Sequence, residues 1–112
     1  MSPEEAERLL SLGAVALDVR TPREHEELGH IPGALLLPVE LVHAAPAVLS
    51  DDGRPVVVVC EHGMRSRQAA AILAEAGIQV SNMTGGMSRW TGPRVHEPSP
   101  VAGPSPWLLA NA

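Results

Sequence analysis

The sequence contains no lysine, no tyrosine and no phenylalanine, and it has a single cysteine. With two tryptophans as its only large aromatic residues, the core must be built from valine, leucine, isoleucine, alanine and methionine. One cysteine cannot form a disulfide within the chain, and with five scattered histidines it makes no spaced cluster of metal ligands. We therefore expect no metal and no cofactor, and the cysteine is either core filler or a reactive thiol.

Positive charge is also scarce, because eight arginines stand against thirteen acidic residues and the net charge is −5. A basic stripe of the kind that binds nucleic acid is therefore not expected. The start of the chain is acidic and polar, unlike a secretory signal, and no apolar run reaches membrane-spanning length. At 112 residues the chain has the length of one domain, and we expect it to be cytoplasmic, without nucleic-acid or membrane partners.

Strand-like and helix-like segments alternate along the chain. Ser2, Pro3 and Glu5 predict a capped helix that ends at Gly13, and Thr21 starts a second helix by the same capping pattern. Apolar segments without a helical period predict strands at 14–19, 35–37, 56–60 and 78–83. This alternation predicts an α/β fold, in which a mostly parallel sheet carries helices on both faces.

Further helices are expected near Val39, where Pro46 limits or kinks the helix, and after the cysteine loop, where Ser66 is a suitable N-cap. A Gly-Gly turn leads to a last helical turn ending at Trp90. The proline-rich segment 92–112 has no period. We therefore divide the chain into a domain at 1–91 and a tail at 92–112, whose apolar "WLLA" at 107–110 we expect to pack on the body or on a partner.

The cysteine, Cys60, stands directly after the strand "VVVV" and shortly before a helix. A sulfur at the carboxyl end of such a strand can face unpaired N–H groups of the loop and of the first helical turn. Gly63 permits a tight turn, and the charge of Arg65 favours a thiolate. Glu61 opposes the thiolate if its carboxylate is close, but we expect it to point into solvent.

The segment "CEHGMRS" at 60–66 closely resembles the active-site loop of single-domain rhodaneses, the thiosulfate:cyanide sulfurtransferase family. Three further family motifs occur in order: "DVR" at 18–20, "GHIPGA" at 29–34 and "GGMSRW" at 85–90. The resemblance implies a doubly wound rhodanese-like fold. It also implies that the cysteine takes up a sulfane sulfur as a persulfide and passes it to a nucleophile.

On this resemblance Cys60 is the nucleophile and sulfur carrier, and Arg20 is a secondary candidate only. The loop residues that would bind the substrate are Glu61, His62, Gly63, Met64, Arg65 and Ser66. The donor would be a small anion such as thiosulfate. Without a second cysteine to resolve the persulfide, the acceptor must be external: cyanide, a thiol or a protein.

Alternatives to catalysis remain open for the chain and for single residues. The domain could be a sulfur carrier or binding module that serves one protein partner. Phosphatase activity is a more distant alternative, since four residues separate Cys60 from Arg65, whereas related phosphatases have five. Asp18, Arg20 and His30 fit structural roles, namely an amide cap, a carboxylate pair and a turn. His25 stands where the family often has an aromatic residue.

Overall fold

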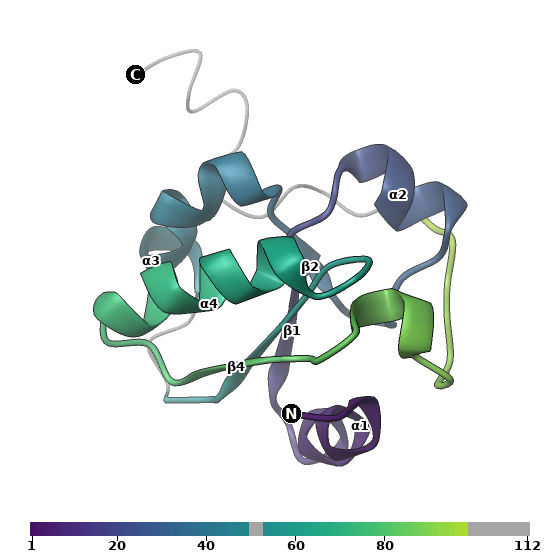
Figure 1. The fold of residues 1–112 in the computed structure, drawn as a ribbon, viewed down its shortest axis with the longest axis horizontal. Coiled ribbons are helices and arrows are strands. Elements are labelled where there is room, and N and C mark those ends of the chain that lie inside the picture. The colour runs from purple at the N-terminus through teal and green to yellow at the C-terminus, as the bar shows by residue number, and fades with distance from the viewer. Residues whose placement is uncertain (50–52, 99–112) are drawn as a thin grey trace.

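The computed structural model describes residues 1–49 and 53–98. In this part of the chain, helices and strands alternate as the sequence predicts (Figure 1). The elements are α1 (Pro3–Ser11), β1 (Val15–Asp18), α2 (Pro22–Glu27), β2 (Leu35–Leu36), the 3-10 helix η1 (Val39–Ala44), α3 (Ala45–Val48), β3 (Val56–Val59), α4 (Met64–Glu75), β4 (Val80–Asn82) and the 3-10 helix η2 (Gly86–Arg89).

The four strands form one sheet in the order β2-β1-β3-β4, and every neighbouring pair is parallel. The chain winds outward from β1 to β2 on one side and from β3 to β4 on the other, which confirms the doubly wound fold. Ligands bind such sheets beyond the carboxyl ends of the strands, where the winding reverses. Here that place lies beyond Asp18 and Val59, which are paired in register at the ends of β1 and β3.

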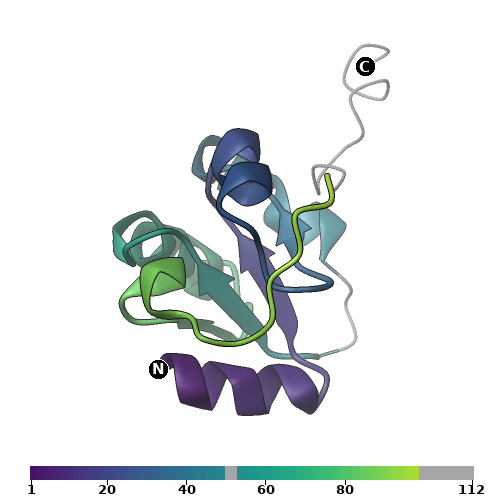
Figure 2. The ribbon, with the colours of Figure 1, turned by 90° about the vertical axis from the view of Figure 1, so that its right-hand side faces the viewer.

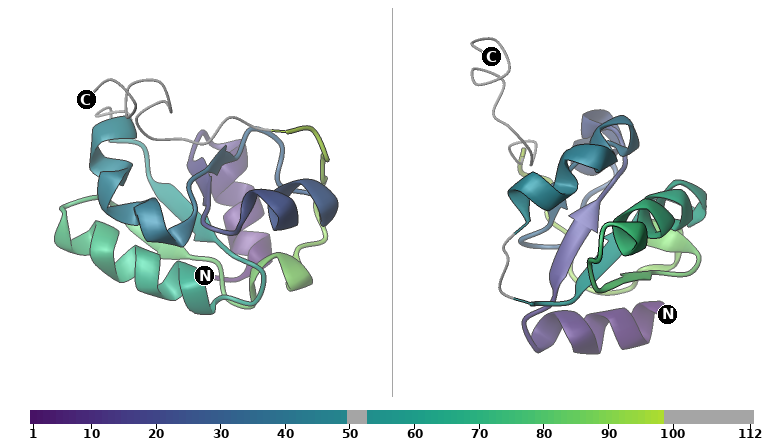
Figure 3. Two further views of the ribbon diagram at one scale, coloured as in Figure 1. Left: turned by 90° about the horizontal axis from the view of Figure 1, so that it is seen from above. Right: turned by 90° about the vertical axis from the view of Figure 1, so that its left-hand side faces the viewer.

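Alternate residues of β3 face opposite layers of the core. Val56 and Val58 belong to one apolar cluster, with Leu73 of α4. Val57 and Val59 belong to the other, which also contains Ala6 of α1 and Met87 and Trp90 at η2. Figure 3 shows α1 and α4 on opposite faces of the sheet, so the predicted covering of both faces is confirmed. Each fully buried leucine or valine stabilises the fold by roughly 1.5–3 kcal/mol.

Local capping determines where the first two helices begin. The hydroxyls of Ser2 and Thr21 accept hydrogen bonds from the N–H groups of Glu5 and Glu24, whose carboxylates bond back to the N-cap backbone. The predicted helix near Val39 differs in form, because it is η1 followed by the short α3. Pro46 lies in the first turn of α3, where its missing N–H leaves no hydrogen bond unmade, and does not limit or kink a helix there.

The helix after the cysteine begins earlier than predicted. Its N-cap is Gly63, whose φ of +97° turns the chain sharply, so α4 starts at Met64. The prediction that Ser66 caps this helix is therefore wrong. Ser66 lies in the first turn of α4 with its side chain fully buried, and its hydroxyl faces Cys60.

The first residues of the predicted tail lie along the body of the domain, as Figure 2 shows for the segment after η2. Val95 forms an antiparallel bridge with His30, and the His30 Nε2–H donates to the carbonyl oxygen of Glu97 at 2.7 Å. His30 thus bonds to backbone, as predicted, with Nδ1 3.2 Å from the Ile31 carbonyl oxygen of its own turn, but its Nε2 joins it to the segment after η2. The apolar segment at 107–110 lies outside the described residues, and the division at residue 91 stays a prediction.

The 3-10 helix η2 packs against the backbone of the cysteine loop. The N–H groups of Met87 and Ser88 donate to the carbonyl oxygens of Cys60 and Glu61 at 2.8 and 3.0 Å. Gly86 makes this approach possible, because a Cβ at this position would collide with both carbonyl oxygens.

We predict that Gly86→Ala lowers the free energy of unfolding more than Gly33→Ala does. Both glycines have positive φ, at +68° and +80°, and backbone strain alone costs about 1–3 kcal/mol. Only Gly86 adds a backbone collision, since a Cβ at Gly33 meets nothing within 4 Å. Chemical denaturation measures both variants, and equal losses would contradict the proposed close packing.

Candidate active site

Cys60 follows β3 directly, at the reversal point of the sheet, and its side chain is 1% exposed. The Gly63 N–H donates to the sulfur at 3.0 Å, and the Ser66 hydroxyl oxygen lies 3.3 Å from it. Gly63 is the N-cap of α4 and Ser66 lies in its first turn, so both contacts come from the start of this helix. The loop therefore folds back over its own cysteine.

The surroundings of the sulfur favour its negative form. Burial raises the pKa of Cys60, but the Ser66 hydroxyl and the N–H groups of Ser66, Gly63 and His62 lower it by more. The pKa of the thiol therefore lies below its ordinary value. Thiolates are the nucleophilic form of cysteine, so this geometry supports a reactive thiol over core filler.

Arg65 has a carboxylate partner that the sequence analysis does not identify. Its Nη1 and Nη2 donate to the two carboxylate oxygens of Glu24, on α2, at 2.6 and 2.7 Å. Hydrogen bonds from Arg65 lower the pKa of Glu24 to about 2. The two hydrogen bonds leave Arg65 further N–H groups for an anion. The hydrogen bonds to Glu24 raise the pKa of Arg65, and the nearby Cys60 thiolate raises it further.

Glu61 does not point into solvent, and that prediction is wrong. Its carboxylate accepts a hydrogen bond from Arg20 Nη1 at 3.0 Å. Arg20 is fully buried and also donates to both carboxylate oxygens of Asp18. Arg20 thus pairs with a nearby carboxylate, as predicted, and it also holds the Glu61 carboxylate in an ion pair.

His25 is a buried residue of this region whose role the sequence analysis does not predict. Its Nδ1 contacts the Asp18 carboxylate at 2.7 Å, and its ring stacks on His30 with 3.6 Å between centroids. Burial raises the pKa of Asp18, but hydrogen bonds from His25 and Arg20 outweigh it, so the pKa is lowered. One signal in the sequence could have drawn attention to His25: it stands at a position where the rhodanese family often has an aromatic ring.

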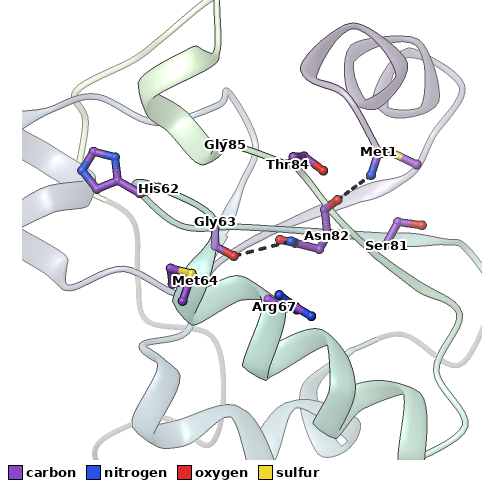
Figure 4. A pocket seen from close by; sticks show the side chains of 9 residues that line it. All are labelled: Met1, His62, Gly63, Met64, Arg67, Ser81, Asn82, Thr84 and Gly85. Carbon is purple, nitrogen blue, oxygen red and sulfur yellow. Dashed lines mark hydrogen bonds between the residues drawn. The ribbon is translucent and has the colours of Figure 1, made fainter.

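His62 and Met64 border an open pocket of about 600 Å³ beside the loop (Figure 4). Met64 is 72% exposed, whereas Met87 is fully buried in the core. The other residues that line the pocket are Met1, Gly63, Arg67, Ser81, Asn82, Thr84 and Gly85. Both predicted loop residues are thus accessible to a substrate.

Within residues 1–49 and 53–98, no group of three or more histidine, cysteine, aspartate or glutamate side chains could hold a metal ion. In the same described ranges no helix is both long and apolar enough to cross a membrane.

We predict that Cys60 is alkylated with a midpoint pH below the value of about 8.5 for a free thiol. Iodoacetamide labelling followed by mass spectrometry across the pH range measures this midpoint. Ser66→Ala raises it, because the thiolate loses a hydrogen-bond donor. A midpoint at or above that of a free thiol in the unaltered protein would contradict the stabilisation of the thiolate.

Comparison with known proteins agrees with this geometry. The model of the rhodanese-like domain family matches residues 2–93. "Thiosulfate sulfurtransferase GlpE" of Ectopseudomonas mendocina (strain ymp) is 38% identical over 91 residues, covering 80% of this chain and 82% of the relative. The protein of the same name from Pseudomonas fluorescens (strain Pf0-1) is 42% identical over 89 residues, covering 79% and 80%.

Among solved structures, a rhodanese-related protein from Thermoplasma volcanium matches with a TM-score of 0.79. It is 26% identical, and the match covers 87% of this chain and 97% of that one. Fold, motifs and relatives agree, and the chain belongs to the rhodanese-like domain family.

Proposed function

We propose that the protein is a thiosulfate sulfurtransferase in which Cys60 carries the transferred sulfur. The enzyme class predicted from the sequence is confirmed by curated relatives that are named thiosulfate sulfurtransferase. The roles of individual residues are our proposal. The observation that carries it is a buried sulfur that receives a loop N–H and contacts a hydroxyl, where burial alone would keep the thiol neutral.

In the first step the Cys60 thiolate attacks the outer, sulfane sulfur of thiosulfate. A bond forms between the two sulfurs, the bond from the sulfane sulfur to the sulfonate breaks, and sulfite leaves with that electron pair. The product is a persulfide with negative charge on its terminal sulfur. The N–H groups of His62, Gly63 and Ser66 would stabilise this charge, as they do the thiolate's.

In the second step a nucleophile attacks the terminal sulfur. Cyanide would leave as thiocyanate and a thiolate as a new persulfide, and in either case Cys60 regains its electron pair as a thiolate. The acceptor must come from outside, because the chain has no second cysteine. The open pocket bordered by His62 and Met64 gives an acceptor access to the loop.

Arg65 is proposed to bind the anionic donor while Glu24 holds it in place. With its pKa at about 2, Glu24 stays ionised at neutral pH and fixes the guanidinium by two hydrogen bonds. The free N–H groups of Arg65 can then meet the sulfonate of thiosulfate. Such a fixed cation loses less conformational entropy on binding than a free side chain.

A thiol that must stay reduced to act fits the reducing cytoplasm, which we propose as the protein's location. The alternative of a carrier module with its own protein partner depended on the segment 107–110, outside the described residues. No contact among the described residues favours it over the enzyme. The short spacing between Cys60 and Arg65 continues to argue against a phosphatase.

We predict that thiosulfate adds one sulfur atom to the protein. Intact-protein mass spectrometry should show this gain in the wild type, its loss on adding cyanide or a thiol, and no gain in Cys60→Ser. A wild type that gains no sulfur, although Cys60 can still be alkylated, would refute thiosulfate as the donor.

We also predict that Arg65→Ala raises the KM for thiosulfate by roughly tenfold, the equivalent of one charge-assisted hydrogen bond. The KM for a neutral organic polysulfide should change far less. Arg23→Ala, which removes an equal charge from an exposed ion pair on α2, is the matched control. An equal rise in KM for both donors would show that Arg65 does not bind the anionic donor.

A further inference from the structure

Asn82, the last residue of β4, is joined to the cysteine by one intervening hydroxyl. The Ser66 hydroxyl donates to Asn82 Oδ1 at 2.5 Å, and the same hydroxyl oxygen lies 3.3 Å from the Cys60 sulfur. Ser66 is fully buried and Cys60 is 1% exposed, so no solvent replaces either partner. The three side chains form a continuous chain from the sulfur to the pocket that Asn82 lines.

A hydroxyl has one proton, and this limits what Ser66 can do. With Cys60 as a thiol, the S–H donates to Ser66 Oγ and the Ser66 O–H donates to Asn82 Oδ1, so every group is satisfied. With Cys60 as a thiolate or persulfide, the anion needs the Ser66 proton for itself. The hydroxyl must then turn away from Asn82.

Asn82 can follow this change because its amide carries an acceptor at one end and a donor at the other. A half-turn of the amide brings Nδ2 to face Ser66 Oγ, and the chain then runs from amide to hydroxyl to sulfur. The half-turn breaks only the bond from Nδ2 to the Gly63 carbonyl oxygen, which is long at 3.5 Å. Figure 4 shows this bond at the wall of the pocket, where solvent can separate the two oxygens.

We infer that Asn82 is a positioning residue for sulfur transfer: its amide orients the Ser66 hydroxyl toward itself when Cys60 is a thiol and toward the sulfur when Cys60 is negatively charged. This inference rests on the proposed role of Cys60 as sulfur carrier. Asn82 acts only through Ser66 and stabilises both charge states that the cycle requires.

Several charged and titratable groups lie around these three side chains. They are Arg65 and Arg67 of α4, Glu24 of α2, Asp18 and Arg20 at the end of β1, Glu61 and His62 of the loop, and the amino group of Met1, which donates to the Asn82 carbonyl oxygen. Arg65 pairs with Glu24 and Arg20 with Asp18 and Glu61. None of these ion pairs includes Ser66 or Asn82, so a change at Asn82 leaves them in place.

Two substitutions at Asn82 should move the pKa of Cys60 by different amounts. In Asn82→Asp the carboxylate accepts the Ser66 proton in every state and cannot donate, so the midpoint of alkylation should rise by about one pH unit, a tenfold smaller thiolate fraction at pH 7. In Asn82→Ala the hydroxyl loses both the acceptor that competes with the thiolate and the donor that supports it, so the midpoint should move much less than in Asn82→Asp. The kcat for thiosulfate should follow the midpoint, with KM changed little.

Two controls separate the effect of Asn82 through Ser66 from the effect of an added charge in the pocket. Ser81→Asp places a carboxylate in the same pocket without replacing the partner of Ser66, and it should shift the midpoint much less. In a Ser66→Ala background, the shift caused by Asn82→Asp should shrink by at least half. The alkylation readout requires no sulfur transfer, so it tests Asn82 even if thiosulfate proves not to be the donor.

Several outcomes would overturn the inference. They are an unchanged or lowered midpoint in Asn82→Asp, an Asn82→Ala shift as large as that of Asn82→Asp, or a full Asn82→Asp shift without Ser66. Should Asn82→Asp fail to fold, Asn82→Lys decides, because an ammonium can only donate to Ser66 and the midpoint should then fall by more than in Ser81→Lys. Melting temperatures show which variants are folded, and a merely structural Asn82 would change these without moving the midpoint.

Discussion

The structure depends on one constraint: a sulfur that is almost completely buried must be able to carry negative charge. An anion without hydrogen-bond donors is costly in a protein interior. The chain meets this constraint by turning at Gly63 directly after β3, so that an N–H from the turn and a hydroxyl from the first turn of α4 reach the same sulfur. The parallel sheet places Cys60 at the carboxyl end of β3, and Gly63 allows the tight turn into α4.

The carboxylates nearest the loop are kept from opposing this charge. Arg20 forms an ion pair with Glu61, and Arg65 forms one with Glu24. The positive charge of each arginine therefore offsets the repulsion between that carboxylate and the thiolate. Arg20 is itself held by Asp18, which also contacts His25. The ion pairs therefore have a common effect: they lower the electrostatic cost of a negative sulfur and leave the hydrogen bonds to set its pKa.

Features that depend on nearby residues could be predicted from the sequence. The caps at Ser2 and Thr21, the strand before Cys60 and the Gly-Gly turn before η2 each involve only a few consecutive residues, and the structure confirms them. The partners of Arg65 and Glu61 could not be predicted, because each lies 41 residues away in the chain.

The early start of α4 also escaped prediction, since Ser66 has the chemistry of an N-cap and only the fold shows that its hydroxyl is needed by Cys60 and Asn82.

A crystal structure of the protein after exposure to thiosulfate would show whether Cys60 carries the sulfur. We expect one additional sulfur atom bonded to Cys60 Sγ, with the terminal sulfur within hydrogen-bond distance of loop N–H groups and with the Ser66 hydroxyl turned toward the sulfur. A loaded sulfur that lies away from these donors, or a modified protein with Cys60 unchanged, would refute the role proposed for Cys60 and its loop.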